Sequence, residues 1–115
     1  MNLSIGLELV TVVLLAFLLA KMWLGKVSAE RAHELVQHGA RLVDVRTHAE
    51  FSRGHLDGAL NIPVQELASR VSEVGPKDVP VVVYCASGVR SASARSILKS
   101  AGFEVHDLGA MRRWG

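Results

Sequence analysis

The residues most able to take part in a chemical reaction lie in one short stretch around Cys85, the single cysteine of the chain. It directly follows Pro80–Tyr84 (PVVVY), a run typical of a strand buried on both faces. A loop of small residues and the start of a helical pattern come next: Ala86, Ser87, Gly88, Val89 and Arg90. Such a loop lets consecutive backbone N–H groups point inward, and a helix N-terminus adds partial positive charge. We expect this arrangement to stabilise a thiolate and make Cys85 a nucleophile.

A lone cysteine also has a structural interpretation, because a buried thiol can act as a small apolar side chain. It cannot form an internal disulfide or a zinc site built from cysteines. The five histidines show no ligand spacing, so the sequence predicts no metal site and no cofactor. The loop and Arg90 favour a nucleophile over an inert thiol.

The charges of this 115-residue chain are unevenly distributed. Residues 1–29 carry Glu8, Lys21 and Lys26 alone, whereas residues 30–115 hold 11 Lys/Arg and 10 Asp/Glu. The net charge of +2 leaves no basic surplus, so no nucleic-acid partner is expected. Half of the residues are hydrophobic, which excludes disorder, and one cysteine excludes a disulfide-stapled secreted fold.

Residues 3–24 form an apolar leader that predicts a transmembrane anchor helix. Its first 18 residues would extend about 27 Å as a helix, close to the hydrocarbon thickness of a bilayer. Lys21 and Trp23 resemble interfacial anchors, and positive side chains lie only on this side. We therefore expect a single pass through the bacterial inner membrane, contact with membrane lipid, and a cytoplasmic catalytic domain. The alternative is a cleaved signal peptide, although no positive side chain precedes the apolar run.

Residues 27–115 predict an α/β domain with a parallel sheet flanked by helices, because strand and helix patterns alternate. Thr47-x-x-Glu50 is a capping box that opens a short helix ending at Gly54. Ligands of such sheets bind at the carboxyl ends of strands, where Cys85 lies. Strands are expected at 41–45, 59–62, 80–84 and 104–107, with a short edge strand from 26, and helices within 28–39, 47–54, 64–71 and 89–101.

Three motifs follow one another along the chain. They are D-V-R…E-F…G-H-L-x-G-A…N-I-P within 42–67, C-x-S-G-x-R at 85–90, and G-x-x-x-x-W at 109–114. Together they make residues 27–115 resemble a single-domain rhodanese. The resemblance implies a persulfide on Cys85, a loop-closing basic residue at Arg90, and Asp44 near the base of the loop, where it would orient Arg90. It also implies oxyanion-binding backbone amides at Ala86, Ser87, Gly88, Val89 and Arg90.

The expected function is membrane-anchored sulfur transfer from thiosulfate or a persulfide donor to a thiophilic acceptor through Cys85. Because the chain has no second cysteine, the acceptor is a small thiol or the cysteine of a partner protein. One alternative is phosphoryl transfer, but related dual-specificity phosphatases have five residues between cysteine and arginine, and this chain has four. The other is a non-enzymatic rhodanese-fold module for docking or sulfide sensing at the membrane.

Other polar residues are interpreted as structural. Arg46 and Glu50 are four positions apart and could pair at the start of a short helix. Ser91 receives no role. Arg112 and Arg113 are interpreted as a solvated end, which would touch anionic head groups if the domain lies on a membrane.

Overall fold

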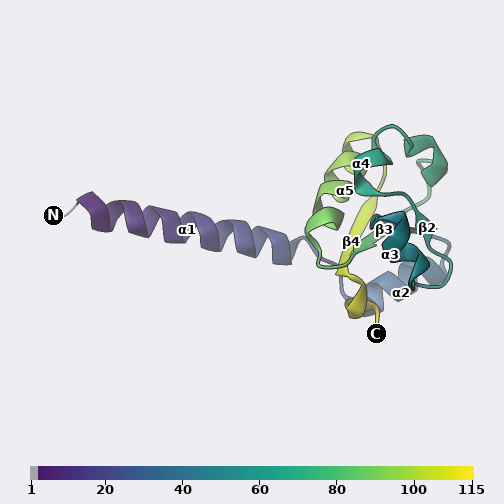
Figure 1. The fold of residues 1–115 in the computed structure, drawn as a ribbon, viewed down its shortest axis with the longest axis horizontal. Helices are drawn as coiled ribbons and strands as arrows, with labels where there is room; N and C mark the ends of the chain where they lie inside the picture. The colour runs from purple at the N-terminus through teal and green to yellow at the C-terminus, as the bar shows by residue number, and fades with distance from the viewer. Residues whose placement is uncertain (1–2) are drawn as a thin grey trace.

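The computed structural model describes residues 3–115, with side chains described for residues 4–20 and 25–115. A long first helix reaches away from an α/β domain in which helices and strands alternate (Figure 1). The helices are α1 (Leu3–Leu24), α2 (Ala29–Gln37), α3 (His48–Ser52), α4 (Val64–Leu67) and α5 (Val89–Ser100), with 3-10 turns η1 (Val71–Val74) and η2 (Met111–Trp114). The strands are β1 (Arg41–Asp44), β2 (Leu60–Asn61), β3 (Val81–Cys85) and β4 (Val105–Ala110).

The strands of the described chain form one parallel sheet in the order β2-β1-β3-β4. β3 pairs with β1 on one edge and with β4 on the other, and all of its residues are buried. This burial on both faces is what its uninterrupted β-branched run predicts. The predicted parallel sheet flanked by helices is confirmed, with Cys85 as the last residue of the central strand rather than the first one after it.

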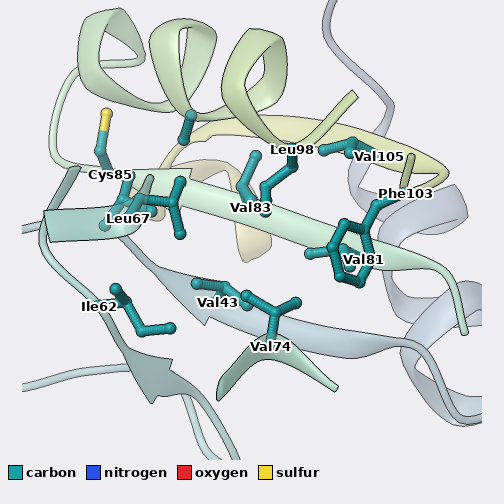
Figure 2. Packing of buried hydrophobic residues seen from close by; sticks show 12 residues of the cluster. Val43, Ile62, Leu67, Val74, Val81, Val83, Cys85, Leu98, Phe103 and Val105 are labelled. Atoms are coloured by element: carbon teal, nitrogen blue, oxygen red, sulfur yellow. The ribbon is translucent and has the colours of Figure 1, made fainter. Parts of the chain in front are cut away.

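Side chains of β3 alternate between two cores, one on each face of the sheet. Odd-numbered residues pack with Ala94 and Leu98 of α5, and even-numbered residues pack with Ala32 and Leu35 of α2. Figure 2 shows Cys85 at the end of the strand within the first core, with its sulfur on the face covered by α5. The candidate nucleophile is therefore fixed by the packing of the domain.

β4 contains a bulge near the carboxyl end of the sheet. Val83 pairs with Asp107 and Tyr84 pairs with Gly109, so Leu108 is an extra residue on β4. Gly109 has φ of +86°, which favours glycine, and its N–H donates to Oδ1 of Asp107 at 2.8 Å. The bulge brings Gly109 beside the loop that follows β3, and Lys26 links Asp107 to the same loop.

Some element boundaries differ from those expected. The predicted edge strand from Lys26 is only an isolated bridge to Asp107, supported by a 2.8 Å hydrogen bond from the Val27 N–H to the Asp107 carbonyl. The expected strand at 59–62 is limited to β2, and the last strand continues through Ala110 because the bulge lets pairing resume beyond it.

The helix α1 does not support the predicted transmembrane anchor. Crossing a hydrocarbon core of about 30 Å takes about 20 consecutive, mostly apolar residues. For α1, side chains are described only at residues 4–20. Among the described residues, no helix is both long enough and apolar enough to cross a membrane. This finding contradicts the predicted location in the inner membrane and leaves membrane lipid unsupported as a partner. The anchoring roles predicted for Lys21 and Trp23 lie outside the described side chains.

The packing between α5 and the sheet gives a first test. Leu98 is fully buried against β3, so Leu98→Ala removes apolar contacts and leaves a cavity. We expect it to lower the free energy of unfolding by about 2–5 kcal/mol, measured by urea denaturation. Lys99→Ala, at an exposed position of the same helix, should change it by under about 1 kcal/mol. Equal losses in both variants would contradict this description of the core.

Candidate active site

The sulfur of Cys85 accepts two backbone hydrogen bonds from the start of α5. The Gly88 N–H donates with a nitrogen–sulfur distance of 3.0 Å, and the Ser91 N–H donates at 3.3 Å. Cys85 is fully buried, so these donors take the place that water has around an exposed thiol. Both donors, and the positive end of α5, stabilise negative charge on this sulfur.

Gly88 gives the loop its shape. It is the N-cap residue of α5, with φ of +104° and ψ of −7°, a left-handed conformation that side chains with a Cβ rarely adopt. Its carbonyl oxygen accepts a 3.1 Å hydrogen bond from the buried hydroxyl of Ser91. One residue thus turns its N–H toward the sulfur and its carbonyl toward the helix.

Lys26, which precedes α2, stabilises the same loop through its side chain. Its Nζ donates to the Gly88 carbonyl at 3.0 Å and pairs with Oδ2 of Asp107 at 2.6 Å. The side chains of Lys26 and Asp107 are 10% and 2% exposed, and losing one partner of a buried pair typically costs about 3–5 kcal/mol. No local sequence pattern indicates this role, because Lys26 lies 62 residues before Gly88.

Arg90 is held on the other side of the loop by Glu50. Two hydrogen bonds join their side chains, Nη1 to Oε1 at 2.6 Å and Nη2 to Oε2 at 2.9 Å. The predicted capping box of α3 is confirmed, and through it the Thr47 N–H also donates to Oε1 of Glu50. Arg90 first, and then Thr47, lower the pKa of Glu50 to about 2, so this carboxylate is ionised at neutral pH. The capping box therefore orients the carboxylate that holds Arg90.

Asp44 does not contact Arg90 through any hydrogen bond found in the described residues. Its buried carboxylate accepts hydrogen bonds from Nε and Nη2 of Arg46, at 3.1 and 2.7 Å, and this interaction raises the pKa of Arg46. The pair expected between Arg46 and Glu50 is therefore replaced by two other pairs. The reason is geometric. The chain turns after β1, so the guanidinium group of Arg46 reaches the carboxylate of Asp44, two residues earlier. Glu50 instead faces Arg90, at the end of the loop after β3.

The predicted oxyanion-binding amides were those of Ala86, Ser87, Gly88, Val89 and Arg90. Among them, the Gly88 N–H is the one that donates to the sulfur. Ser91 lies just beyond the predicted range and supplies the second donor. A signal for it was present, since the first turn of any helix has N–H groups without partners in the helix.

A small cavity opens between this loop and the end of β4. Its volume is about 120 Å³, and it is lined by Lys26, Ser87, Gly88, Gly109, Ala110, Arg112 and Arg113. The basic pair that was interpreted as a solvated end therefore lies beside the candidate nucleophile's loop. Arg113 also donates a hydrogen bond from Nη1 to the Leu108 carbonyl, which holds it against the bulge of β4.

Comparison with known proteins agrees with this geometry. Residues 28–115 match the model of the rhodanese-like domain, and the chain belongs to that family. It is 42% identical over 78 residues to the uncharacterized protein YqhL of Bacillus subtilis, covering 66% of this chain and 61% of YqhL. It is 35% identical over 72 residues to the thiosulfate sulfurtransferase PspE of Escherichia coli, covering 61% of this chain and 69% of PspE.

A solved structure gives the same result at the level of the fold. The human single-domain sulfurtransferase TSTD1 superposes with a TM-score of 0.69 at 31% identity, covering 78% of this chain and 94% of that one. The predicted rhodanese-like α/β fold is confirmed, and two of these relatives, PspE and TSTD1, are named as sulfurtransferases. The chain spans less than two thirds of the length of YqhL.

The pair between Glu50 and Arg90 predicts a dependence of stability on pH. The pKa of Glu50 is lowered from 4.5 to about 2, so its contribution is present above about pH 4.5 and is lost as pH falls toward 2. We expect Glu50→Gln to lower Tm at neutral pH, measured by thermal melts followed by circular dichroism. The difference in Tm between wild type and this variant should narrow as pH falls from about 4.5 to 2. Asp78→Asn, at an exposed carboxyl, serves as control. A gap that stays constant down to pH 2 would contradict the assignment.

Proposed function

We propose that this protein is a sulfurtransferase that carries sulfane sulfur as a persulfide on Cys85, taken from thiosulfate or a persulfide donor. The observation that carries the proposal is the buried Cys85 sulfur that accepts two backbone hydrogen bonds at the start of α5. Relatives named as sulfurtransferases support the same activity. A site of this kind stabilises a sulfur anion without any other reactive side chain.

In the proposed loading step, the Cys85 thiolate attacks the outer sulfur of thiosulfate. A new S–S bond forms to Cys85 while the bond between the two sulfurs of thiosulfate breaks, and sulfite leaves with that electron pair. The three negative charges of the reactants are those of the persulfide and sulfite. The N–H groups of Gly88 and Ser91 donate to the Cys85 sulfur and support the proposal that its thiolate is stabilised before the attack. After the attack, the negative charge lies on the outer sulfur of the persulfide.

The surrounding residues have distinct proposed roles. Arg90 recognises the anionic donor with the guanidinium N–H groups that Glu50 does not use, and its side chain is 30% exposed. The amides of Ala86, Ser87 and Val89 complete the cradle for the outer sulfur. Asp44 acts at one remove, by holding Arg46 at the end of β1.

The sulfur must then leave to an acceptor outside the chain. Cys85 is the single cysteine of the sequence, so no second thiol is present to resolve the persulfide. An acceptor thiolate attacks the outer sulfur, and Cys85 leaves as the thiolate. Small thiols and a partner protein's cysteine both have the necessary chemistry.

Loading of Cys85 is the direct test. We expect thiosulfate to add the mass of one sulfur atom to the purified protein, located on Cys85 by peptide mass spectrometry. Cys85→Ser, which is nearly isosteric, should retain the fold by circular dichroism and abolish loading. A folded wild type that never loads would indicate a docking or sensing module, and near-normal turnover in Cys85→Ser would refute the role of Cys85.

Arg90 gives a second test, because its charge and its pairing with Glu50 can be separated. We expect Arg90→Met to raise the KM for thiosulfate about tenfold or more, since a charge-assisted hydrogen bond is lost. The KM for 2-hydroxyethyl persulfide, whose tail is uncharged, should rise less. Arg90→Lys keeps the charge without the bidentate pair and should retain most of the thiosulfate affinity. Equal effects of Arg90→Met on both donors would point to a purely structural role.

A further inference from the structure

We propose that the cavity beside the loop is a carboxylate subsite for small thiols that exchange sulfur with Cys85. The inference rests on the proposed function and adds a substrate class to it, namely low-molecular-weight thiols with a carboxylate a few bonds from sulfur. The groups that would bind the carboxylate are the guanidinium groups of Arg112 and Arg113. They are distinct from Arg90 and from the amides that hold the sulfur.

Charge is the first argument. Three basic side chains line the cavity, and in the described part of the chain only Lys26 among them forms an ion pair, with Asp107. Arg113 donates to the neutral carbonyl of Leu108, and Arg112 is exposed. Two guanidinium charges at one small cavity are therefore not balanced by a carboxylate of the described chain. A bound carboxylate would supply that balance, and arginine forks match carboxylates in geometry.

The size of the cavity favours a small molecule over a protein partner as its ligand. The volume of the cavity is about 120 Å³. That volume accepts a carboxylate with a short carbon chain. A protein partner would instead need a contact face many times larger.

Position connects this cavity to the chemistry. Gly88 lines the cavity, and the N–H of the same residue donates to the Cys85 sulfur at 3.0 Å. Lys26 and Gly109 fix that shared wall, through the 3.0 Å bond to the Gly88 carbonyl and the close approach of the Gly109 backbone. A thiol whose carboxylate lies in the cavity therefore has its sulfur end near the loop.

The subsite would serve the transfer of the outer sulfur from Cys85 to a small thiol. The thiolate of the small molecule attacks the outer sulfur of the Cys85 persulfide and forms a new S–S bond. The S–S bond to Cys85 breaks, and its electron pair returns to the Cys85 sulfur as thiolate. The subsite positions the acceptor through its carboxylate and takes no part in bond breaking.

The experiment uses three acceptors in which two methylene groups separate the thiol from a carboxylate, a hydroxyl or an ammonium group: 3-mercaptopropionate, 2-mercaptoethanol and cysteamine. Protein loaded with thiosulfate is freed of excess donor, and loss of the persulfide is followed after mixing with each thiol. We expect Arg112→Gln with Arg113→Gln to slow transfer to 3-mercaptopropionate about tenfold. Transfer to 2-mercaptoethanol should stay within about twofold, and transfer to cysteamine should be unchanged or faster.

Controls separate charge from folding. Arg112→Gln alone alters an exposed side chain and should slow transfer to 3-mercaptopropionate by less than the double variant does. Arg112→Lys keeps the positive charge and should leave this rate near that of wild type. Lys99→Gln removes a positive charge at the far end of α5 and should leave all three rates unchanged. Equal slowing with all three acceptors, or no slowing with 3-mercaptopropionate, would overturn the subsite.

A binding measurement keeps this inference separate from the proposed function. The thioether 3-(methylthio)propionate cannot accept sulfur, so its binding to unloaded protein does not depend on sulfur transfer. We expect it to shift the amide signals of Gly88 and Gly109 in NMR titrations of wild type and not of the double variant. Absence of these shifts in wild type overturns the subsite even if Cys85 loads normally. Their presence with a Cys85 that never loads supports a carboxylate site in the cavity but refutes sulfur transfer, and with it the role of this site in holding sulfur acceptors.

Discussion

The site depends on one physical constraint: a sulfur buried at the end of a central strand has to be surrounded by protein donors instead of water. The N–H groups of Gly88 and Ser91 meet this demand. They do so because Gly88 adopts the left-handed conformation that starts α5 directly after a short loop. Backbone donors have fixed directions, so charge developing on Cys85 meets dipoles that are already oriented and need little reorganisation.

The loop keeps this shape because buried or half-buried ion pairs hold it from two sides. On the β4 side, Lys26 links the Gly88 carbonyl to Asp107, whose position follows from the bulge. On the β1 side, Glu50 holds Arg90 with two hydrogen bonds. These contacts join the first residues of the domain, its short third helix and its last strand at one point. The core under β3 then anchors the strand from which the loop departs (Figure 2).

Charge near the thiol differs sharply from charge averaged over the chain. The net charge of +2 leaves no basic surplus over the whole chain, yet Lys26, Arg90, Arg112 and Arg113 all lie around one loop. Asp107 and Glu50 pair with the first two of these side chains. Such local accumulation raises the concentration of small anions at a site even when the whole molecule is almost neutral. It suits the anionic donors of the proposed sulfur transfer. The sequence alone indicated a solvated end for Arg112 and Arg113, because their approach to the loop depends on tertiary contacts.

The sequence by itself determined the features that depend on neighbouring residues: the buried strand that leads to Cys85, the small loop before α5, and the capping box that orients Glu50. Backbone patterns of this kind act within a few residues, so their signals are local. Tertiary structure alone decided which charges meet. Arg90 reaches Glu50 across 40 positions and Lys26 reaches Gly88 across 62, while Asp44 turns to Arg46. These partners follow from the order of strands and the bulge in β4, which bring the carboxyl ends of β1, β3 and β4 to one edge of the sheet.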